Sequence, residues 1–254
     1  MKRVDKKRPK IVASIEARMG SSRLPGKVLA DVNGQPALKR LITRLKKCKY
    51  LDDIVIATSI SPDDDILEKW AKNESILCYR GSENNVLQRV VDANLWAKSD
   101  LIVEITGDCI LTDPEVIDMG IETFLENECD VVTNCGTYLS YPMGINVQVF
   151  RADDLRVISE TINDEAVQEH VSLYFYEHPE IYKIINLVAP NRWTNTEFRF
   201  QLDYSEDLEF LNKIYQFLEP KYGDDFGIEE LMQLMIDRPD LSQINIHCEE
   251  RPAR

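Results

Sequence analysis

The stretch "IVASIEARMGSSRLPGK", residues 11–27, places a cationic loop directly after a run that is typical of a buried β-strand. The run "IVASI" is short and rich in β-branched residues, as the strands of parallel sheets are. In the loop, small residues let backbone N–H groups approach an anion, and Pro25 and Gly26 fix a turn that aims Lys27 back over it. The loop therefore predicts an anion site built from Arg18, Gly20, Ser21, Ser22, Arg23 and Lys27.

This loop differs from two common phosphate-binding motifs. Five residues, instead of four, separate Gly20 from Gly26, and Val28 stands where the Ser or Thr of a Walker P-loop would follow the lysine. The GxGxxG pattern of dinucleotide sites is also missing. Ligands of open α/β sheets bind beyond the carboxyl ends of the strands, so the loop lies where a triphosphate is expected. The alternative is a polar surface loop whose charges are solvated.

Further apolar runs alternate with helical patterns along the first half of the chain. Short β-branched runs predict buried strands at 54–59, 76–81, 101–106 and 130–134. Apolar periodicity and capping residues predict helices over 37–48, 63–73 and 84–98. Strands that alternate with helices in this way indicate an α/β fold, with a doubly wound, mostly parallel sheet flanked by helices.

The pattern changes after residue 145. Strands of a mixed part of the sheet are predicted at 145–150, 182–187 and 197–203, and helices near 164–178, 205–218 and 227–238. There is no Gly-, Pro- or Ser-rich linker and no internal repeat. We therefore expect a single domain over residues 11–254, preceded by a basic, flexible tail over residues 1–10.

Charge and cysteine usage narrow the classes of function. The net charge is −14, which argues against nucleic acid as a partner because an acidic surface repels phosphate backbones. The six cysteines form no CxxC pair, and no run reaches the roughly 18 apolar residues that a membrane-spanning helix needs. We expect a reduced, cytoplasmic protein without a membrane span.

Two aspartates follow predicted core strands and are candidate metal ligands. Asp108 comes after "VEITG", and Asp203 ends "FRFQLD". Carboxylates at strand ends beside a phosphate site are the hard oxygen ligands that Mg²⁺ uses. Each aspartate is also open to interpretation as a helix cap. Asp113 fits that second role better, because it precedes Pro114, and proline prefers the first helical position.

The motifs together resemble the cytidylyltransferases that activate acidic sugars, the CMP-Kdo and CMP-sialate synthetases, and most closely their spore-coat polysaccharide (SpsF-type) branch. That branch typically reads "QARMGSTRLPGKVL" where this chain has "EARMGSSRLPGKVL". Further matches follow in order: "RGSENNVLQRV", "TGDCILTDPEVID", "YPMGINVQVF", "EHVSLYFYEHPE", "FRFQLDYSEDLEFL" and "IEELMQLMIDRPDL". The resemblance therefore covers nearly everything after the tail.

The resemblance implies a Rossmann-like, glycosyltransferase-A-like nucleotidyltransferase that moves CMP from CTP onto an anionic acceptor. Arg18, Arg23 and Lys27 match the cations that hold the triphosphate, with Arg18 and Lys27 as the catalytic pair. Asp108 and Asp203 match the Mg²⁺-binding aspartates. The resemblance also implies a homodimer that makes precursors for surface polysaccharides.

Departures from the family pattern concern the acceptor and the base. Glu16 replaces the usual Gln, and neutral residues stand at 143, 146 and 148, where relatives often carry acids. We expect an acceptor with more negative charge, such as an acidic sugar, sugar phosphate or phosphonate; the alternative is drift on a surface hairpin. Arg80, at a strand end, is a further candidate for nucleotide binding. Candidate acceptor-binding residues are Tyr141, Asn146, Gln148, His170 and Arg199, with His170 placed on an amphipathic helix.

Other functions on the same fold stay open at this point. A glycosyltransferase would also bind a nucleotide through a metal and carboxylates, but it normally carries a DxD motif, and Ile110 interrupts that spacing after Asp108. An inactive nucleotide-binding protein and a nucleotidyltransferase that uses another NTP are the remaining alternatives.

Overall fold

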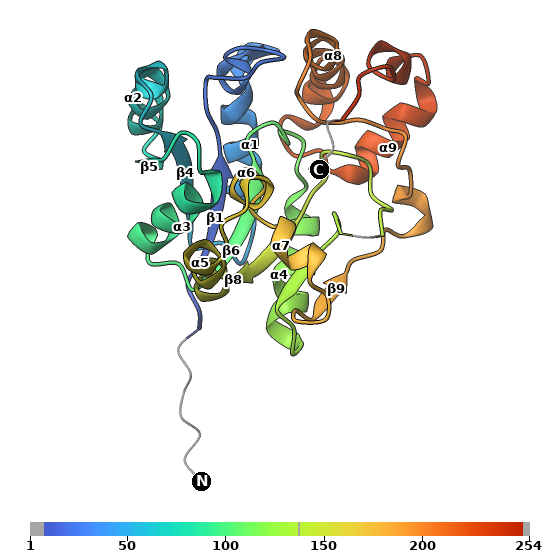
Figure 1. Ribbon diagram of the computed structural model, residues 1–254. Helices are drawn as coiled ribbons and strands as arrows, with labels where there is room; N and C mark the ends of the chain where they lie inside the picture. The colour runs from blue at the N-terminus through green and yellow to red at the C-terminus, as the bar shows by residue number, and fades with distance from the viewer. Residues whose placement is uncertain (1–7, 137, 251–254) are drawn as a thin grey trace.

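The computed structural model describes residues 8–136 and 138–250, and seven strands in this part form one sheet (Figure 1). Their order across the sheet is β5-β4-β1-β6-β8-β7-β9. The strands are β1 (Ile11–Glu16), β4 (Asp53–Ser59), β5 (Leu77–Gly81), β6 (Leu101–Thr106), β7 (Val131–Thr133), β8 (Gln148–Arg151) and β9 (Ile184–Asn186). The strands predicted in the first half of the chain are therefore confirmed.

Strand β1 lies at the centre of the parallel part and is apolar on both faces. It pairs in parallel with β4 on one side and β6 on the other. Ile11, Ala13 and Ile15 enter the core on one face of the sheet, and Val12 enters the core on the opposite face. A strand covered on both faces needs a continuous apolar run, which is what "IVASI" supplies.

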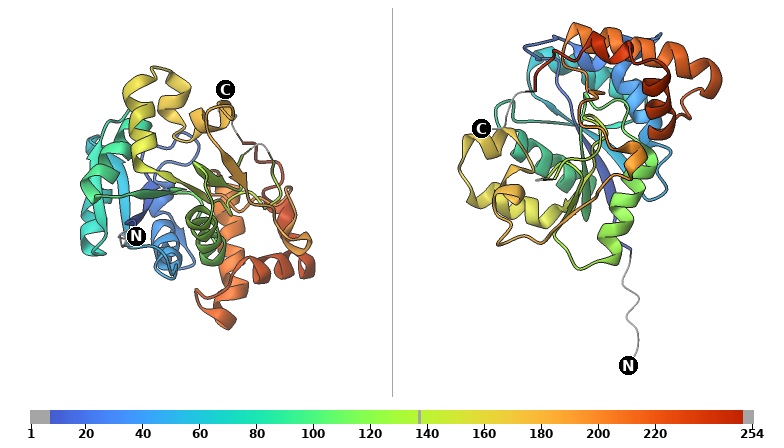
Figure 2. Two further views of the ribbon diagram at one scale, coloured as in Figure 1. Left: turned by 90° about the horizontal axis from the view of Figure 1, so that it is seen from below. Right: turned by 90° about the vertical axis from the view of Figure 1, so that its right-hand side faces the viewer.

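Helices cover both faces of the sheet (Figure 2). One face packs against α1 (Ala37–Leu45), α2 (Asp65–Asn73), α4 (Pro114–Glu126), α8 (Ser205–Tyr222) and α9 (Ile228–Asp237). The other face packs against α3 (Val86–Ala97), α5 (Ala152–Thr161), α6 (Glu165–Glu169) and α7 (Leu173–Glu177). Short β2 (Asp31–Val32) and β3 (Gln35–Pro36) form a separate antiparallel pair before α1. The chain has the expected Rossmann-like, single-domain architecture.

Strand β8 is reversed relative to its neighbours. It runs antiparallel to both β6 and β7, whereas β7 and β9 run parallel to each other. The mixed part of the sheet that the sequence predicts is thus confirmed. The carboxyl ends of β1, β4, β5 and β6 share one edge of the sheet, here called the carboxyl edge, and β8 begins near it at Gln148.

The strand predicted over 197–203 is wrong. Phe200 and Leu202 are fully buried, but Arg199 and Asp203 are buried as well, and the segment forms only an isolated parallel bridge between Arg199 and Met143. Its backbone bonds instead to two loops: Phe200 N–H donates to Met143 O, and Leu202 N–H donates to Asp108 O. The apolar residues of this segment are therefore buried without pairing of the segment as a strand.

The helix predicted over 164–178 is two short helices, α6 and α7. His170 has extended backbone, with φ −114° and ψ 96°, and ends α6. After this break the Ser172 hydroxyl donates to Glu104 on β6, and both Val171 and Phe175 are buried. Tertiary contacts of this kind override local helix propensity. His170 is therefore an exposed junction residue and not part of an amphipathic helix.

Two residues that directly precede β1 contact the body of the protein. Residues 1–7 of the predicted tail lie outside the described residues. Arg8 pairs with Asp52 at 3.0 Å and Lys10 pairs with Asp53 at 2.6 Å, so these two tail residues contact the start of β4 and the residue before it. Among the described residues no helix is long and apolar enough to cross a membrane.

Candidate active site

Residues 17–26 fold into a tight loop between β1 and the 3-10 helix η1 (Lys27–Leu29). The N–H groups of Ser21 and Gly26 both donate to the Met19 carbonyl at 2.9 Å. Gly26 has φ 72°, in the left-handed region that favours glycine. Asp64 Oδ1 accepts from the Met19 N–H at 2.7 Å and ties the loop to the end of β4. The turn predicted at residues 25 and 26 is therefore present.

The ammonium of Lys27 lies between two carboxylates that are distant in the sequence. Its Nζ is 2.6 Å from Asp108 Oδ2 and 2.7 Å from Asp203 Oδ1. Arg23 donates to the same Asp203 oxygen at 2.6 Å. Burial alone would lower the pKa of Lys27, but the two carboxylates outweigh it, and the pKa is raised. The structure thus brings four predicted site residues together at the carboxyl edge.

Asp108 stays ionised for a related reason. Burial would raise the pKa of its carboxyl group, but the charge of Lys27 and hydrogen bonds from Lys27, Thr106 and Gln201 outweigh burial, and the pKa is lowered. Asp108 follows β6 by two residues, as the sequence predicts. Asp113, excluded from the site as a helix cap, accepts from the N–H groups of Glu115 and Val116 at the start of α4.

A buried network holds Asp203 in place. Arg199 Nη2 donates to Asp203 Oδ2 at 2.8 Å, and Arg199 Nε donates to Asp207 Oδ1 at 3.0 Å. The Asp203 N–H donates to Asp207 Oδ2 at 2.9 Å. The side chain of Arg199 is only 5% exposed. The structure therefore places Arg199, which the sequence predicts as an acceptor-binding residue, in a buried network with these aspartates.

A large pocket opens over this cluster, with a cavity volume of about 960 Å³. Arg18 and Glu169 form an exposed ion pair at 3.2 Å in its wall, so α6 meets the cationic loop. Of the predicted acceptor residues, Asn146 and His170 line the pocket. The lining also includes Glu16, which departs from the family pattern, and residues that the sequence does not single out: Val86, Arg89, Glu169, Gln201 and Glu250.

Three other predicted residues lie elsewhere. Arg80 donates to Asp65 at 2.6 Å and Glu68 at 2.9 Å on the surface of α2. Tyr141 is buried, and Gln148 is buried where it accepts from the Tyr176 hydroxyl. The structure does not bring these three side chains to the pocket. Asp65 and Glu68 of α2 neutralise the charge of Arg80, which the sequence predicts to bind the nucleotide.

The residues at the centre of the pocket fit a Mg²⁺ ion. A single cationic atom, Lys27 Nζ, already contacts a carboxylate oxygen from Asp108 and another from Asp203. Among the described residues no group of three or more His, Cys, Asp or Glu side chains is arranged to hold a metal. Mg²⁺ commonly binds through one or two carboxylates plus substrate phosphates. The pair therefore suits an ion shared with a phosphorylated ligand.

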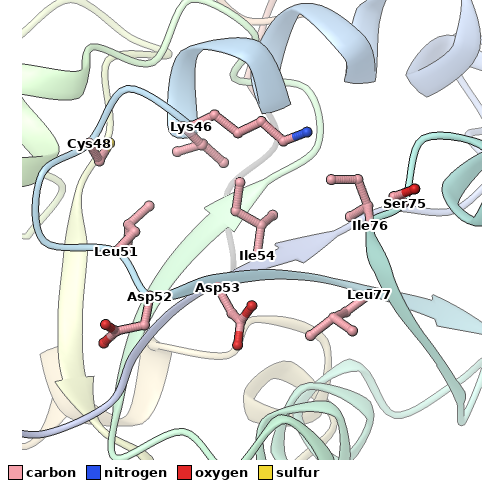
Figure 3. A pocket seen from close by; sticks show the side chains of 10 residues that line it. Lys46, Cys48, Leu51, Asp52, Asp53, Ile54, Ser75, Ile76 and Leu77 are labelled. Atoms are coloured by element: carbon pink, nitrogen blue, oxygen red, sulfur yellow. The ribbon is translucent and has the colours of Figure 1, made fainter.

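A smaller cavity of about 340 Å³ lies at the other end of the strands (Figure 3). Leu51, Ile54, Ile76 and Leu77 line it, at the amino ends of β4 and β5. Its carboxylates are already paired, Asp52 with Arg8 and Asp53 with Lys10. Ligands of open α/β sheets bind at the opposite ends of the strands, so the larger pocket is the candidate active site.

Comparison with known proteins relates this chain to cytidylyltransferases. The family model described as Cytidylyltransferase matches residues 12–237. The spore coat polysaccharide biosynthesis protein SpsF of Bacillus subtilis is 36% identical over 91% of this chain and 95% of its own length. A solved cytidylyltransferase from Leptospira borgpetersenii is 28% identical, with a TM-score of 0.86 over 96% of this chain and 99% of the other. CMP:2-keto-3-deoxy-manno-octonic acid synthetase, solved with CTP, shares the fold at 17% identity and a TM-score of 0.61, over 82% and 98% of the two chains.

Proposed function

Because the chain belongs to the cytidylyltransferase family, we propose that it transfers CMP from CTP to an anionic acceptor and releases pyrophosphate. The observation that carries this proposal is the Lys27 ammonium, held between Asp108 and Asp203 at the carboxyl edge. An acceptor oxygen attacks the α-phosphorus of CTP, and the bond from this phosphorus to the bridging oxygen breaks. Pyrophosphate leaves with the electron pair, and the proton of the acceptor hydroxyl passes to solvent.

The cations of the loop bind the triphosphate in this proposal. Nucleotidyl transfer asks the protein mainly to position the reactants and to neutralise charge. Lys27 stabilises the charge that develops on the α-phosphate, while Arg18 and Arg23 hold the β- and γ-phosphates. All three cations face carboxylates before substrate binds. Phosphate oxygens replace those carboxylates as their partners, so the cations need no large movement.

Asp108 and Asp203 would hold Mg²⁺ when the nucleotide is bound. The metal, when bound, neutralises phosphate charge and polarises the reacting phosphate. Arg199 and Asp207 keep Asp203 in a fixed orientation, and Thr106 and Gln201 do the same for Asp108. Such support matters because small errors in the position of a ligand reduce the rate of transfer.

An acidic sugar or a related anion is the proposed acceptor. The activities named for the relatives, spore coat polysaccharide biosynthesis and synthesis of a CMP-linked octonic acid, support this class. Of the three neutral positions that motivated the expectation, only Asn146 lines the pocket. Met143 contacts Arg199, and Gln148 accepts from Tyr176. Asn146 and His170 are therefore the residues proposed to contact the acceptor.

Pyrophosphate release tests the proposal. Each of CTP, UTP, GTP and ATP is supplied with Mg²⁺ against a panel of acidic sugars, sugar phosphates and phosphonates. We expect release with CTP and one class of acceptor, and its loss in Asp108→Asn. The matched control is Asp65→Asn, which changes an exposed aspartate on α2 and should behave as wild type. Release that is equal for all nucleotides, or that persists in Asp108→Asn, contradicts the proposal.

A further inference from the structure

Two glutamates meet in the wall of the candidate active site. Glu16 ends β1, and Glu104 lies on the adjacent β6. In the parallel register Ser14 lies opposite Glu104 and Glu16 opposite Thr106, so both glutamate side chains project from the same face of the sheet. Glu16 lines the pocket, whereas Glu104 is 4% exposed and lies behind it.

One carboxyl oxygen of Glu16 has no hydrogen-bond partner among the described residues. This atom, Oε1, is fully buried. Glu104 accepts from the Ser172 hydroxyl and is in hydrogen-bonding contact with Glu16. The charge of Arg89 on α3 favours an ionised Glu16, but the Arg89 guanidinium donates its hydrogen bonds to the carbonyls of Ala57 and Ser82.

Two carboxyl groups in such contact do not both ionise near neutral pH. Burial is the main cause that raises the pKa of both groups, and the negative charge of Glu104 raises that of Glu16 further. Asp108 adds to the effect on Glu16, and Arg89 opposes it. Tyr176 on α7 and Cys135 after β7 also face Glu104, and burial raises the pKa of each, so both stay neutral.

We propose that Glu16 is a nucleotide-binding residue that acts as a neutral carboxylic acid: its proton is held against Glu104, and its remaining oxygen accepts a hydrogen bond from the bound nucleotide. The donor is an N–H group of the base, which cytosine supplies through its exocyclic amine. This inference rests on the proposed function, because it takes CTP as the ligand. A protonated Glu and a Gln each offer a donor group and an acceptor oxygen. A neutral Glu16 can therefore replace the Gln that related sequences typically have at this position.

The contact between Glu16 and Glu104 determines how the affinity for CTP changes with pH. CTP binds the protonated form, so affinity is full below the raised pKa and falls as the pH rises through it. Loss of the proton puts a second negative charge in a wall that faces a polyphosphate. Above the pKa the Kd rises toward about tenfold per pH unit, because one pKa unit corresponds to a factor of ten.

Calorimetry of CTP binding with Mg²⁺ over a series of pH values tests the proposal, because the affinity should fall as the pH rises through the raised pKa of Glu16. Glu16→Gln keeps a donor toward Glu104 and an acceptor toward the pocket, so it should remove the part of the pH dependence that belongs to the pair. Glu16→Met removes both and should weaken binding by about two- to tenfold at every pH, the net value of one hydrogen bond. Glu160→Gln, on the exposed surface of α5, is the matched control and should keep the wild-type pH dependence.

A second variant guards against a folding defect at Glu16. Glu104→Gln removes the negative charge beside Glu16, so the weakening of CTP binding should move to lower pH. Titration of the nucleotide phosphates is the same for every variant and cancels in the comparison. The same pH dependence in wild type, Glu16→Gln and Glu104→Gln would overturn this inference alone. A wild-type protein that binds no CTP at any pH would overturn the proposed function, and this inference with it.

Discussion

Replacing Arg199 with Met tests whether this guanidinium is a structural support for Asp203. Its Nη2 contacts Asp203 Oδ2 at 2.8 Å and Asp207 Oδ2 at 3.3 Å, and its Nε contacts Asp207 Oδ1 at 3.0 Å. Both aspartates are almost completely buried. Methionine fills most of the volume of the arginine side chain but leaves the two carboxylates without their shared cation.

The magnitude lies at the lower end of the range for a broken buried ion pair, which is about 3–5 kcal/mol. Asp203 retains Arg23 and Lys27, and Asp207 retains the Asn245 amide and two backbone N–H groups. We therefore expect Arg199→Met to lower the free energy of unfolding by about 3 kcal/mol. For a domain of this size that corresponds to a Tm lower by about 6–12 °C.

Urea unfolding and a thermal melt followed by circular dichroism measure the change. Arg192→Met is the control, because Arg192 is 64% exposed and pairs with an exposed Glu229, so no measurable destabilisation is expected. If Arg199→Met were as stable as wild type, the buried network would not hold Asp203 as described. A stable variant with a raised KM for the acceptor would instead restore the sequence-based prediction that Arg199 contacts it.

Three further changes have defined outcomes. Lys27→Met should lower pyrophosphate release by on the order of a hundredfold, because it removes a charge aimed at the transferred phosphate. Glu169→Gln frees Arg18 from its ion pair and should tighten CTP binding by calorimetry; weaker binding would show that Glu169 orients Arg18 instead. Asp113→Ala removes the N-terminal cap of α4 and the bond to the Ile228 N–H, so the free energy of unfolding measured in urea should fall by about 1–2 kcal/mol. An unchanged urea midpoint would refute that assignment.

The sequence predicts the centre of the site well because a simple topological rule applies. Parallel strands end at a common edge, so the loop after β1 and the aspartate after β6 must converge there. Lys27, Arg23, Asp108 and Asp203 meet as expected, although no single stretch of the chain contains all four. Asp203 reaches the edge even though the strand predicted before it is not formed.

Sequence reasoning is weaker for side chains whose partners are distant in the sequence. In an extended segment Arg199 and Asp203 point to the same side, because they are four residues apart. The sequence does not show that Arg199 also pairs with Asp207. Arg80 looks like an anion-binding residue until α2 brings two acids against it. The Glu16 and Glu104 pair is also invisible locally, because burial and strand pairing, not sequence spacing, bring the two groups together.

The reversal of β8 gives the two halves of the site different capacities to change during evolution. The nucleotide half is built on β1, β4 and β6, where a shift of one residue would turn every side chain to the opposite face. Among the described residues, 138–142 and 188–198 belong to no strand, and each stretch leads into one residue of the isolated bridge between Met143 and Arg199. Insertions and deletions in these two stretches leave the paired strands in register. A change over residues 199–203 would instead displace Arg199 and Asp203. Loop length can therefore vary on this side of the molecule while the strands that position Lys27 and Asp108 keep their register.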